Sequence, residues 1–473
     1  MNTQKRSDEA AVAAFAAQLQ DELIRPSDAN YDQARAVWNG IIDRRPTLIA
    51  RCAGVEDVAA AVNFAREQGL VLSVRGGGHN VAGHGTNDGG LVIDLAPMKR
   101  IEVDPVARTA RAEGGVTWGE LDAATQVHGL ATPGGVFSGT GIAGLTLGGG
   151  YGWLRARYGL SCDNLIGAEV VTASGQVVRA GESENTDLLW GLRGGGGNFG
   201  VVTTFEYRLH PVGPAVGTVF VFHDGEGDRS AQAVRGYRDY MAGAPDEVSG
   251  VAFLGIVPPM PDLFPAETHG KRYVAFGAVY AGPPEEGQTI LAPLRELGTP
   301  LADHSGIRPY VEMQKMFDAD YPDGLHYYWK SLTLASLIDA AIERIVAHAR
   351  QQPSIYSTTD LWEIRGAVAR GSAASSAYHG RGAAYLLNSE ANWEDAAADD
   401  ANIGWARALV ADIEQYSDGS RYLNFAGFQE EGDEMMRKAF GPQYARLAML
   451  KRKYDPHNLF SLNQNIKPAE EGR

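Results

Sequence analysis

Three glycine-rich runs in the first 200 residues constrain the fold of this chain more than any other feature. They span residues 75–80 (RGGGHN), 133–152 and 193–200 (RGGGGNFG), in a chain with 58 glycines among 473 residues. The usual glycine share is about 7%. Glycine adopts positive φ and lets the backbone approach a ligand, so that N–H groups can bind phosphate. Together the runs predict a large anionic cofactor held by backbone, although each run alone could also serve a tight turn.

The sequence around these runs excludes two common nucleotide-binding motifs. No run ends in Gly-Lys-Ser/Thr, as a Walker-type loop requires. A Rossmann turn places its glycines between a strand and a helix. Run 193–200 instead precedes a strand pattern at 201–209. The glycines therefore favour a nucleotide site of a different kind.

The segments between the runs predict a mixture of helices and strands. Helical spacing and period-two alternation distinguish the two. Before residue 215 the expected helices are 55–68 and 118–128, and the expected strands are 70–74, 91–95, 100–103, 108–113 and 201–209, with a hairpin over 169–178. After about residue 217 the glycines thin out and longer helices appear, at 226–242, 285–297 and 338–351, with strands at 251–257 and 273–280 between them. We expect a glycine-rich first domain, a second domain with longer helices, and a helical tail that stops at Asp455-Pro456.

Charge and targeting signals narrow the class of partner. The chain has 42 basic and 58 acidic residues, a net charge of −16, which repels nucleic acid and anionic membranes unless a basic patch intervenes. We find no such patch, no signal-peptide core and no span of about 18 apolar residues. Two cysteines, Cys52 and Cys162, are too few for a disulfide framework. We therefore expect a cytoplasmic protein that binds a small molecule, as a monomer or a homodimer.

Several reactive side chains could have a structural role rather than a functional one. His79 and His84 lie five apart, but no cysteine pair or further His-Glu motif accompanies them, so we expect no metal. Cys162 has no neighbour in sequence that would lower its pKa, which favours a buried structural thiol. The hydrolase pattern G-x-S-x-G is absent. Beside three glycines, His79 is either a turn residue or part of the cofactor site.

Several segments resemble the FAD-linked oxidases of the berberine bridge enzyme type. The resemblance is carried in family order by 71–80 (VLSVRGGGHN), 87–95 (NDGGLVIDL), 148–152 (GGGYG), 158–164 (YGLSCDN), 188–203 and 454–460 (YDPHNLF). It implies an α+β fold of the vanillyl-alcohol oxidase (PCMH) type. The FAD-binding domain of two α+β subdomains would span 1–215. A substrate domain with an antiparallel sheet covered by helices would span 216–415, and 416–473 would return to the FAD domain.

The resemblance also implies how the flavin is held. It assigns to His79 a covalent bond to the flavin 8α carbon and to Cys162 a second bond to C6, which together predict bicovalent FAD. Cys52 is then a core residue. The same resemblance predicts further cofactor contacts from Arg75, Gly76, Gly77, Gly78, Asn80, Gly83, His84, Thr140, Gly141, Gly144, Gly148, Gly149, Gly150, Gly152, Asn164, Gly200, Val201, Val202, Asn463 and Asn465.

The catalytic base is where the chain departs from the family pattern. Many relatives have Tyr-x-Asn-Tyr near the end, but here the second tyrosine is Phe425. An acidic position used by some relatives aligns with Leu386. The remaining candidates are Tyr151, Tyr378 and Tyr422, with His326 and Tyr328 as further possibilities. A tyrosine base needs nearby positive charge to lower its pKa, and Tyr151 could equally pack against the flavin.

The resemblance implies an oxidase. It would transfer a hydride from a C–OH group, or from a C–N or C–C bond, of a sugar or secondary metabolite to FAD and then to O2, giving H2O2. Thr140 aligns with a position that controls oxygen access in relatives, and its small side chain suits an oxidase. The alternatives are a flavin dehydrogenase with another electron acceptor and an idle protein that retains flavin. The sequence leaves the substrate, the base and the oligomeric state open.

Overall fold

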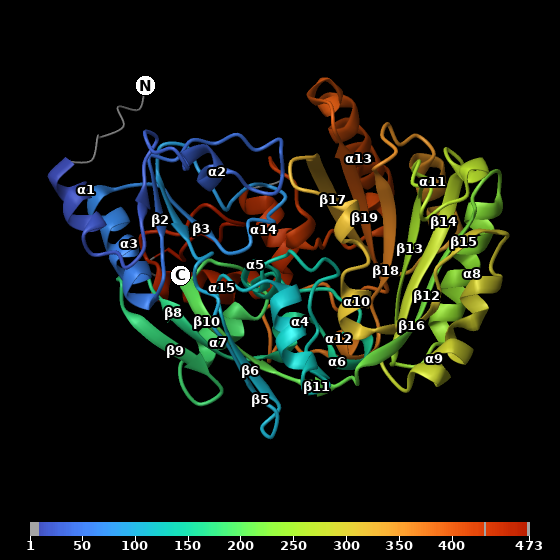
Figure 1. Ribbon diagram of the computed structural model, residues 1–473, viewed down its shortest axis with the longest axis horizontal. Coiled ribbons are helices and arrows are strands. Elements are labelled where there is room, and N and C mark those ends of the chain that lie inside the picture. The colour runs from blue at the N-terminus through green and yellow to red at the C-terminus, as the bar shows by residue number, and fades with distance from the viewer. Residues whose placement is uncertain (1–8, 430–431, 471–473) are drawn as a thin grey trace.

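Two sheets are built from the first 208 residues of the computed structural model, which describes residues 9–429 and 432–470 (Figure 1). The four-stranded sheet has the order β1 (Leu23–Ile24), β2 (Leu48–Arg51), β4 (Leu91–Asp94), β3 (Leu72–Arg75). Its β2/β4 and β3/β4 pairs are parallel. The five-stranded sheet is antiparallel, in the order β5 (Ile101–Asp104), β6 (Thr109–Glu113), β10 (Val201–Arg208), β8 (Leu165–Val171), β9 (Val177–Gly181).

Short helices connect these strands. They are α1 (Glu9–Ala16), α2 (Tyr31–Arg35), α3 (Val55–Gln68), α4 (Trp118–Gln126), α5 (Ile142–Leu147), α6 (Arg155–Tyr158) and α7 (Thr186–Leu192), with a 3-10 helix at Ser161–Asn164. Helix α3 matches the predicted range because the sequence carries signals for both of its ends. Gly69 ends the helix at a φ of 65°, and acids occupy its first turn. A capping box between Thr117 and Glu120 starts α4. The short strands β7 (Leu130–Ala131) and β11 (His210–Pro211) pair with each other.

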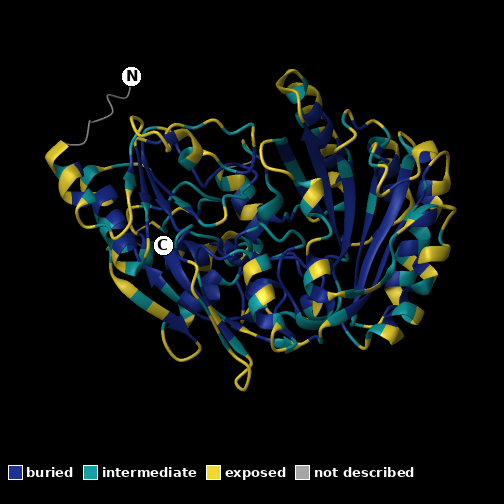
Figure 2. Ribbon diagram, in the orientation of Figure 1, coloured by how far each residue is buried: buried dark blue, intermediate teal, exposed yellow. Residues whose placement is uncertain are grey.

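A large antiparallel sheet follows between residues 215 and 393. Its order is β15 (Pro300–Asp303), β12 (Ala215–Asp224), β14 (Arg272–Tyr280), β13 (Val248–Ile256), β18 (Thr358–Glu363), β19 (Tyr385–Trp393), β17 (His326–Leu334), with β16 (Gly306–Pro309) also paired to β12. Helices α8 (Arg229–Gly243), α9 (Pro284–Leu291), α11 (Asp339–Ala349) and α13 (Asp399–Ile413) pack on its outer face (Figure 1). The central strands are mostly buried (Figure 2). The predicted α+β fold, with an antiparallel sheet covered by helices, is confirmed.

The inner face of this sheet turns toward the N-terminal half. Its side chains share an apolar cluster with residues of the first half, for example Trp362 and Leu386 with Tyr151 and Leu160. The small helices α10 (Tyr310–Gln314) and α12 (Gly366–Arg370) bridge the two halves by contacting α4 and α6. The gap between the halves is where the candidate site lies. No helix in the described part of the chain has the length and apolar character that crossing a membrane requires.

The C-terminal segment returns to the first half of the molecule. Helices α14 (Asp433–Phe440) and α15 (Tyr444–Tyr454) lie among the N-terminal elements (Figure 1), and Leu447 joins the cluster of the five-stranded sheet. Helix α15 ends before Asp455, as predicted. Lys451 and Asp455 are fully buried, and the Lys451 ammonium donates to Asp455 Oδ2 (2.7 Å) and to the carbonyls of Asn198 and Phe460 (both 2.9 Å). The hydrogen bond from Lys451 to the Asn198 carbonyl ties the last segment to the third glycine run.

We expect Lys451→Met to lower the free energy of unfolding by about 3–5 kcal/mol, because it leaves the Asp455 carboxylate buried without its counter-charge. Lys453→Met is the matched control. Its pair with Asp187 is open to solvent, with the two side chains 55% and 40% exposed, so its loss should cost at most about 1 kcal/mol. Urea unfolding of both variants measures the difference. Equal destabilisation by the two changes would show that the buried pair does not fasten the C-terminal segment.

Candidate active site

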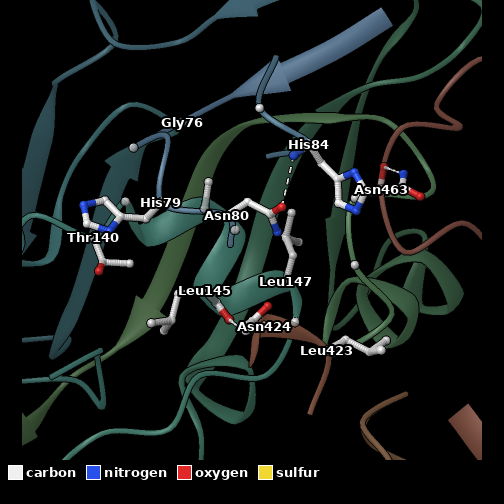
Figure 3. Close-up of a pocket in the computed structure, with 18 of the residues that line it drawn as sticks. Gly76, His79, Asn80, His84, Thr140, Leu145, Leu147, Leu423, Asn424 and Asn463 are labelled. Atoms are coloured by element: carbon white, nitrogen blue, oxygen red, sulfur yellow. Dashed lines mark hydrogen bonds between the residues drawn. The ribbon is translucent and has the colours of Figure 1, made fainter. Parts of the chain in front are cut away.

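One pocket joins the glycine runs to the inner face of the large sheet. Its walls come from 74–85, 135–151, 194–202 and 422–425, from the extended segment 460–464, and from side chains of the sheet. Figure 3 shows His79 and Thr140 together at one side of the view, and His84 and Asn463 at the other. The three runs that the sequence singled out therefore line one elongated cavity.

The first two glycine runs interlock at Gly77 and Gly141. A Cβ on either residue would lie 2.4 Å from the backbone nitrogen of the other, so neither position admits a side chain. Within the described residues, the backbone N–H groups of 77–80 donate no hydrogen bond to the protein. Successive N–H groups of this kind form an anion-binding concavity. This loop could hold the phosphates of a nucleotide cofactor.

The structure divides the predicted cofactor residues into two groups. Those that line the cavity are Arg75, Gly76, Gly77, Gly78, His79, Asn80, His84, Thr140, Gly141, Gly144, Gly148, Gly200, Val201, Val202 and Asn463. Those that do not are Gly83, Gly149, Gly150, Gly152, Cys162, Asn164 and Asn465.

Several of the second group shape the walls from behind. Gly83 closes a turn with Asn80 at a φ of 74°, and a Cβ on Gly152 would lie 2.0 Å from the Gly134 oxygen. Arg75 lines the cavity, but its guanidinium is committed to Asp94, at 2.9 and 3.3 Å. These residues fix the backbone rather than present a side chain.

His79 is held between two aromatic rings at the wall of the cavity. Trp38 stacks on the imidazole with a centroid distance of 4.9 Å, and Phe137 lies at 4.9 Å on a tilted plane. Burial lowers the pKa of His79 to about 4, so the ring is neutral near pH 7 and keeps a nitrogen lone pair. A neutral imidazole is the form that acts as a nucleophile. Sequence reasoning missed Trp38, because nothing near it in the chain indicates that it stacks on this ring.

Cys162 is not among the residues that line the cavity. Its side chain is fully buried and belongs to the apolar cluster that contains Tyr151, Tyr378 and Tyr422. Burial, followed by the Asp163 carboxylate, raises the pKa of the thiol. The thiolate is the nucleophilic form of cysteine. The environment of Cys162 therefore favours an unreactive thiol, and Cys52 is likewise fully buried with a raised pKa.

The three candidate tyrosines are brought together. The hydroxyls of Tyr151 and Tyr378 lie 3.1 Å apart, while the Tyr422 hydroxyl accepts from the Gly150 nitrogen (3.0 Å) and from Asn424 Nδ2 (2.9 Å). Tyr151 and Tyr422 line the cavity, and Tyr378 stands behind Tyr151.

Burial raises the pKa of all three, that of Tyr151 to about 12. Two cations lie nearby, and both are paired: Arg155 with Glu363 (2.5 Å) and Arg381 with Asp163 (3.0 Å). These tyrosines are therefore neutral phenols rather than bases near pH 7.

The other two candidates lie elsewhere and do not line the cavity. His326 Nδ1 lies 2.8 Å from Asp399, and the Tyr328 hydroxyl accepts from Arg407 Nε at 2.8 Å.

Glu390 is the functional candidate that sequence reasoning missed. It lines the cavity from β19, where Tyr321 Oη donates to one carboxylate oxygen (2.7 Å) and Asn388 Nδ2 donates to the other (2.8 Å). Burial raises its pKa. The aligned position, Leu386, is buried in apolar surroundings four residues earlier. Because side chains alternate along a strand, residues 386, 388 and 390 share one face. The sequence signal for Glu390 was therefore an acid on the same strand face, four residues after the aligned position.

Aromatic side chains surround Glu390 in what we call the aromatic lobe of the cavity. The lobe consists of Phe253, Phe317, Tyr321, Trp329, Trp362 and Phe425. Most come from the inner face of the large sheet and from the 310–321 segment. Apolar walls with a few polar groups are typical of small-molecule sites. In the described part of the chain, no cluster of three or more metal-ligating side chains was found.

Comparison with known protein families gives two matches. Residues 46–181 match the family model described as FAD binding domain, and residues 421–467 match the model described as berberine and berberine like. (R)-6-Hydroxynicotine oxidase of Paenarthrobacter nicotinovorans is 32% identical, over 95% of this chain and 97% of its own length. A FAD-linked oxidoreductase of Dictyostelium discoideum is 30% identical, over 96% of each chain.

Solved structures give the same picture. The crystal structure of 6-hydroxy-D-nicotine oxidase from Arthrobacter nicotinovorans superposes with a TM-score of 0.86 at 31% identity, over 95% of this chain and 98% of that one. The glucooligosaccharide oxidase of Acremonium strictum has a TM-score of 0.87 at 24% identity, over 98% and 100% of the two chains, and indicates the shared fold. The FAD of the latter enzyme is described as 6-S-cysteinyl, 8α-N1-histidyl.

Proposed function

The chain belongs to the FAD-linked oxidoreductases of the berberine bridge enzyme type, and from that premise we propose that it is an oxidase whose FAD is bonded covalently through His79 and whose substrate meets the base Glu390. The observation that carries this proposal is the pairing of two groups in one cavity: a neutral imidazole among the glycine runs and a carboxylate in the aromatic lobe. Perturbed titratable groups that converge in a cleft are typical of catalytic sites.

The residues of the cavity fit FAD. The cradle at Gly77 and Gly141 leaves no room for a Cβ, and the N–H groups of 77–80 face no protein acceptor within the described residues. The buried Oδ1 atom of Asn463, which lines the cavity, also lacks a hydrogen-bond partner among these residues, as expected of a site that a polar ligand completes. When bound, FAD supplies an isoalloxazine that accepts a hydride.

We propose a single covalent bond, through His79. The second bond that the sequence predicted, through Cys162, would need a thiolate that reaches the cavity. The Cys162 thiol is fully buried, is not among the residues that line the cavity, and has a raised pKa. The flavin of the glucooligosaccharide oxidase is bonded to both a cysteine and a histidine. The experiment must therefore distinguish one covalent link from two.

Glu390 acts as the base in this proposal. Its carboxylate takes the proton of the substrate O–H or N–H group, so that the adjacent C–H bond can give up a hydride. Tyr321 and Asn388 hold the two carboxylate oxygens in place. The neutral phenols of Tyr151 and Tyr422 form the wall, and Tyr378 supports Tyr151. A base with a pKa raised toward the working pH is the form that general catalysis favours.

We further propose that three segments of the chain have different roles. Residues 1–215 hold FAD, residues 216–415 supply the aromatic lobe and Glu390, and residues 416–473 close the FAD site with Tyr422, Asn424 and Asn463. Thr140 lies beside His79 (Figure 3), and in this proposal its small side chain admits O2, which is reduced to H2O2. The small-molecule substrate is a sugar or secondary metabolite, and the protein is a monomer or homodimer.

Anaerobic substrate screening followed by exposure to O2 tests the oxidase assignment. We expect a substrate to bleach the visible flavin band and air to restore it within seconds, with one H2O2 formed for each turnover. Slow recovery in air with fast recovery by an artificial acceptor would instead assign a dehydrogenase. Absence of bleaching by any alcohol or amine would assign an idle flavin-retaining protein and contradict the proposal.

A further inference from the structure

We propose that Trp38 and Tyr327 are positioning residues for the covalent bond at His79. Tyr327, on strand β17 of the large sheet, holds the Trp38 indole, and the indole orients the His79 imidazole. The bond therefore forms at its full rate only when the large sheet is packed against the N-terminal half. This inference rests on the proposed function, because it concerns the same covalent bond, and it names residues outside the glycine runs that the bond requires.

The His79 imidazole has no hydrogen bond that would orient it. Among the described residues, none donates to or accepts from either of its ring nitrogens. The χ2 torsion of histidine is broad, so the side chain itself sets no sharp ring angle. The ring takes its orientation from Trp38 and Phe137, which pack against it. Bond formation needs the reacting nitrogen close to its target, and an error of about 1 Å can cost about 10²-fold in rate.

The Trp38 indole is held by residues of the large sheet and of the segment that leads into it. It stacks on Tyr327 with a centroid distance of 3.7 Å and an interplanar angle of 17°. Its Nε1 donates to the Tyr321 carbonyl at 3.0 Å. The stack on His79 is looser, with a centroid distance of 4.9 Å. The position of the indole is therefore set by its contact with Tyr327 more than by the ring that it orients.

Asn39 keeps this stack in register. Its fully buried amide accepts from the Tyr327 nitrogen (3.0 Å) and donates to the carbonyls of Tyr327 (2.8 Å) and Val81 (2.7 Å). Strand β17 is the last in the order of its sheet, and an edge strand has backbone groups without a strand partner. The Asn39 amide pairs with one such residue and so ties β17 to the loop that follows the first glycine run.

Tyr327 lies one residue away from the cofactor cavity. It is fully buried and is not among the residues that line the cavity, whereas Trp38 is. Its hydroxyl donates to the Pro322 carbonyl at 2.6 Å, which anchors the ring to the loop before β17. We therefore expect any effect of Tyr327 on the covalent bond to pass through Trp38.

The covalent step that these residues serve has a defined balance. A nitrogen of the neutral imidazole forms a bond to the 8α carbon of FAD, and one C–H bond of the 8α methyl group breaks. One hydrogen is lost from the methyl group and one from the imidazole, and they pass as two protons and two electrons to the isoalloxazine. O2 then removes them as H2O2. Trp38 exchanges no electron in this step and holds the imidazole in place while the bond forms.

Addition of FAD to the full-length chain, purified without flavin, tests this inference. Quenching of flavin fluorescence measures reversible binding, and flavin in the acid-precipitated pellet measures bond formation. We expect Trp38→Leu to slow bond formation at least about tenfold with little change in the Kd for FAD, because the glycine cradle is intact. Trp38→Phe should recover most of the rate, since it keeps an aromatic face against the imidazole. Trp405→Leu is the matched control, because that buried indole also donates to a backbone carbonyl, of His348 (3.0 Å), but from α13.

A double-mutant cycle tests the contact itself. Tyr327→Leu should also slow bond formation, and it should add little in the Trp38→Leu background, as expected of two residues that act through one contact. Additive effects, or a wild-type rate in Trp38→Leu, would overturn the inference.

Two provisions keep the outcome clear. A leucine variant that fails to fold is replaced by methionine, which adapts to the same space and has no aromatic face. Wild-type protein that gains no covalent flavin would overturn the proposed function, whereas covalent flavin formed at the wild-type rate in Trp38→Leu would overturn only this inference.

Discussion

Replacement of Glu390 by glutamine should lower kcat by about 10²–10⁴-fold, the usual contribution of a positioned general base. Glutamine keeps the size of the side chain and can still contact Tyr321 and Asn388, which hold the carboxylate in the wild-type protein. It cannot take a proton. The fall should therefore be in kcat rather than in the amount of folded holoenzyme. Steady-state oxygen consumption and the flavin spectrum measure the two quantities separately.

The pH profile gives this prediction a second readout. Burial raises the pKa of Glu390 above its usual range, and only the deprotonated form accepts a proton. Wild-type kcat/KM should therefore rise with pH through that raised pKa, and the rise should be absent in Glu390→Gln.

Tyr151→Phe is the control, because burial raises the pKa of that phenol to about 12 and it is not ionised near pH 7. A loss in Tyr151→Phe as large as in Glu390→Gln would move the base to the tyrosines.

His79→Ala should convert a flavin that survives denaturation into one that is released completely. The imidazole is held between Trp38 and Phe137 at the cavity wall, and burial lowers its pKa to about 4, so its neutral form is ready to bond the cofactor. The alanine variant keeps the glycine cradle and should still bind FAD reversibly. Acid precipitation followed by absorbance of pellet and supernatant distinguishes the two states.

Cys162→Ala is the matched control for the link. Because the thiol is fully buried, does not line the cavity and has a raised pKa, its removal should leave the flavin in the pellet. If His79→Ala retains the flavin and only the double variant loses it, the flavin has the two covalent links that the sequence predicted.

Much of the fold follows from local sequence signals. Helix α3 has its glycine caps and acidic first turn, and strand β6 has its alternation. The glycine runs correctly indicated a backbone cradle, since the contact between Gly77 and Gly141 admits no side chain. Such features are predictable because they depend on residues that are close in the chain or on glycine itself.

The rest of the site depends on contacts between distant segments. Trp38 stacks on His79 from the segment between α2 and β2, and Glu390 enters the cavity through the register of β18, β19 and β17. Cys162 illustrates the converse. Its sequence neighbours place it beside the cofactor runs, whereas its side chain is fully buried in the cluster of Tyr151 and Tyr378 and is not among the residues that line the cavity. A one-dimensional pattern does not record which side of a wall a residue occupies.

The most direct test of the account is to map the flavin on wild-type protein. After denaturation and proteolysis, the yellow peptide should contain 75–80, with a mass increased by one FAD, and the peptide that contains Cys162 should have its unmodified mass. Release of all flavin on denaturation, or flavin joined to a peptide without His79, would contradict the central claim.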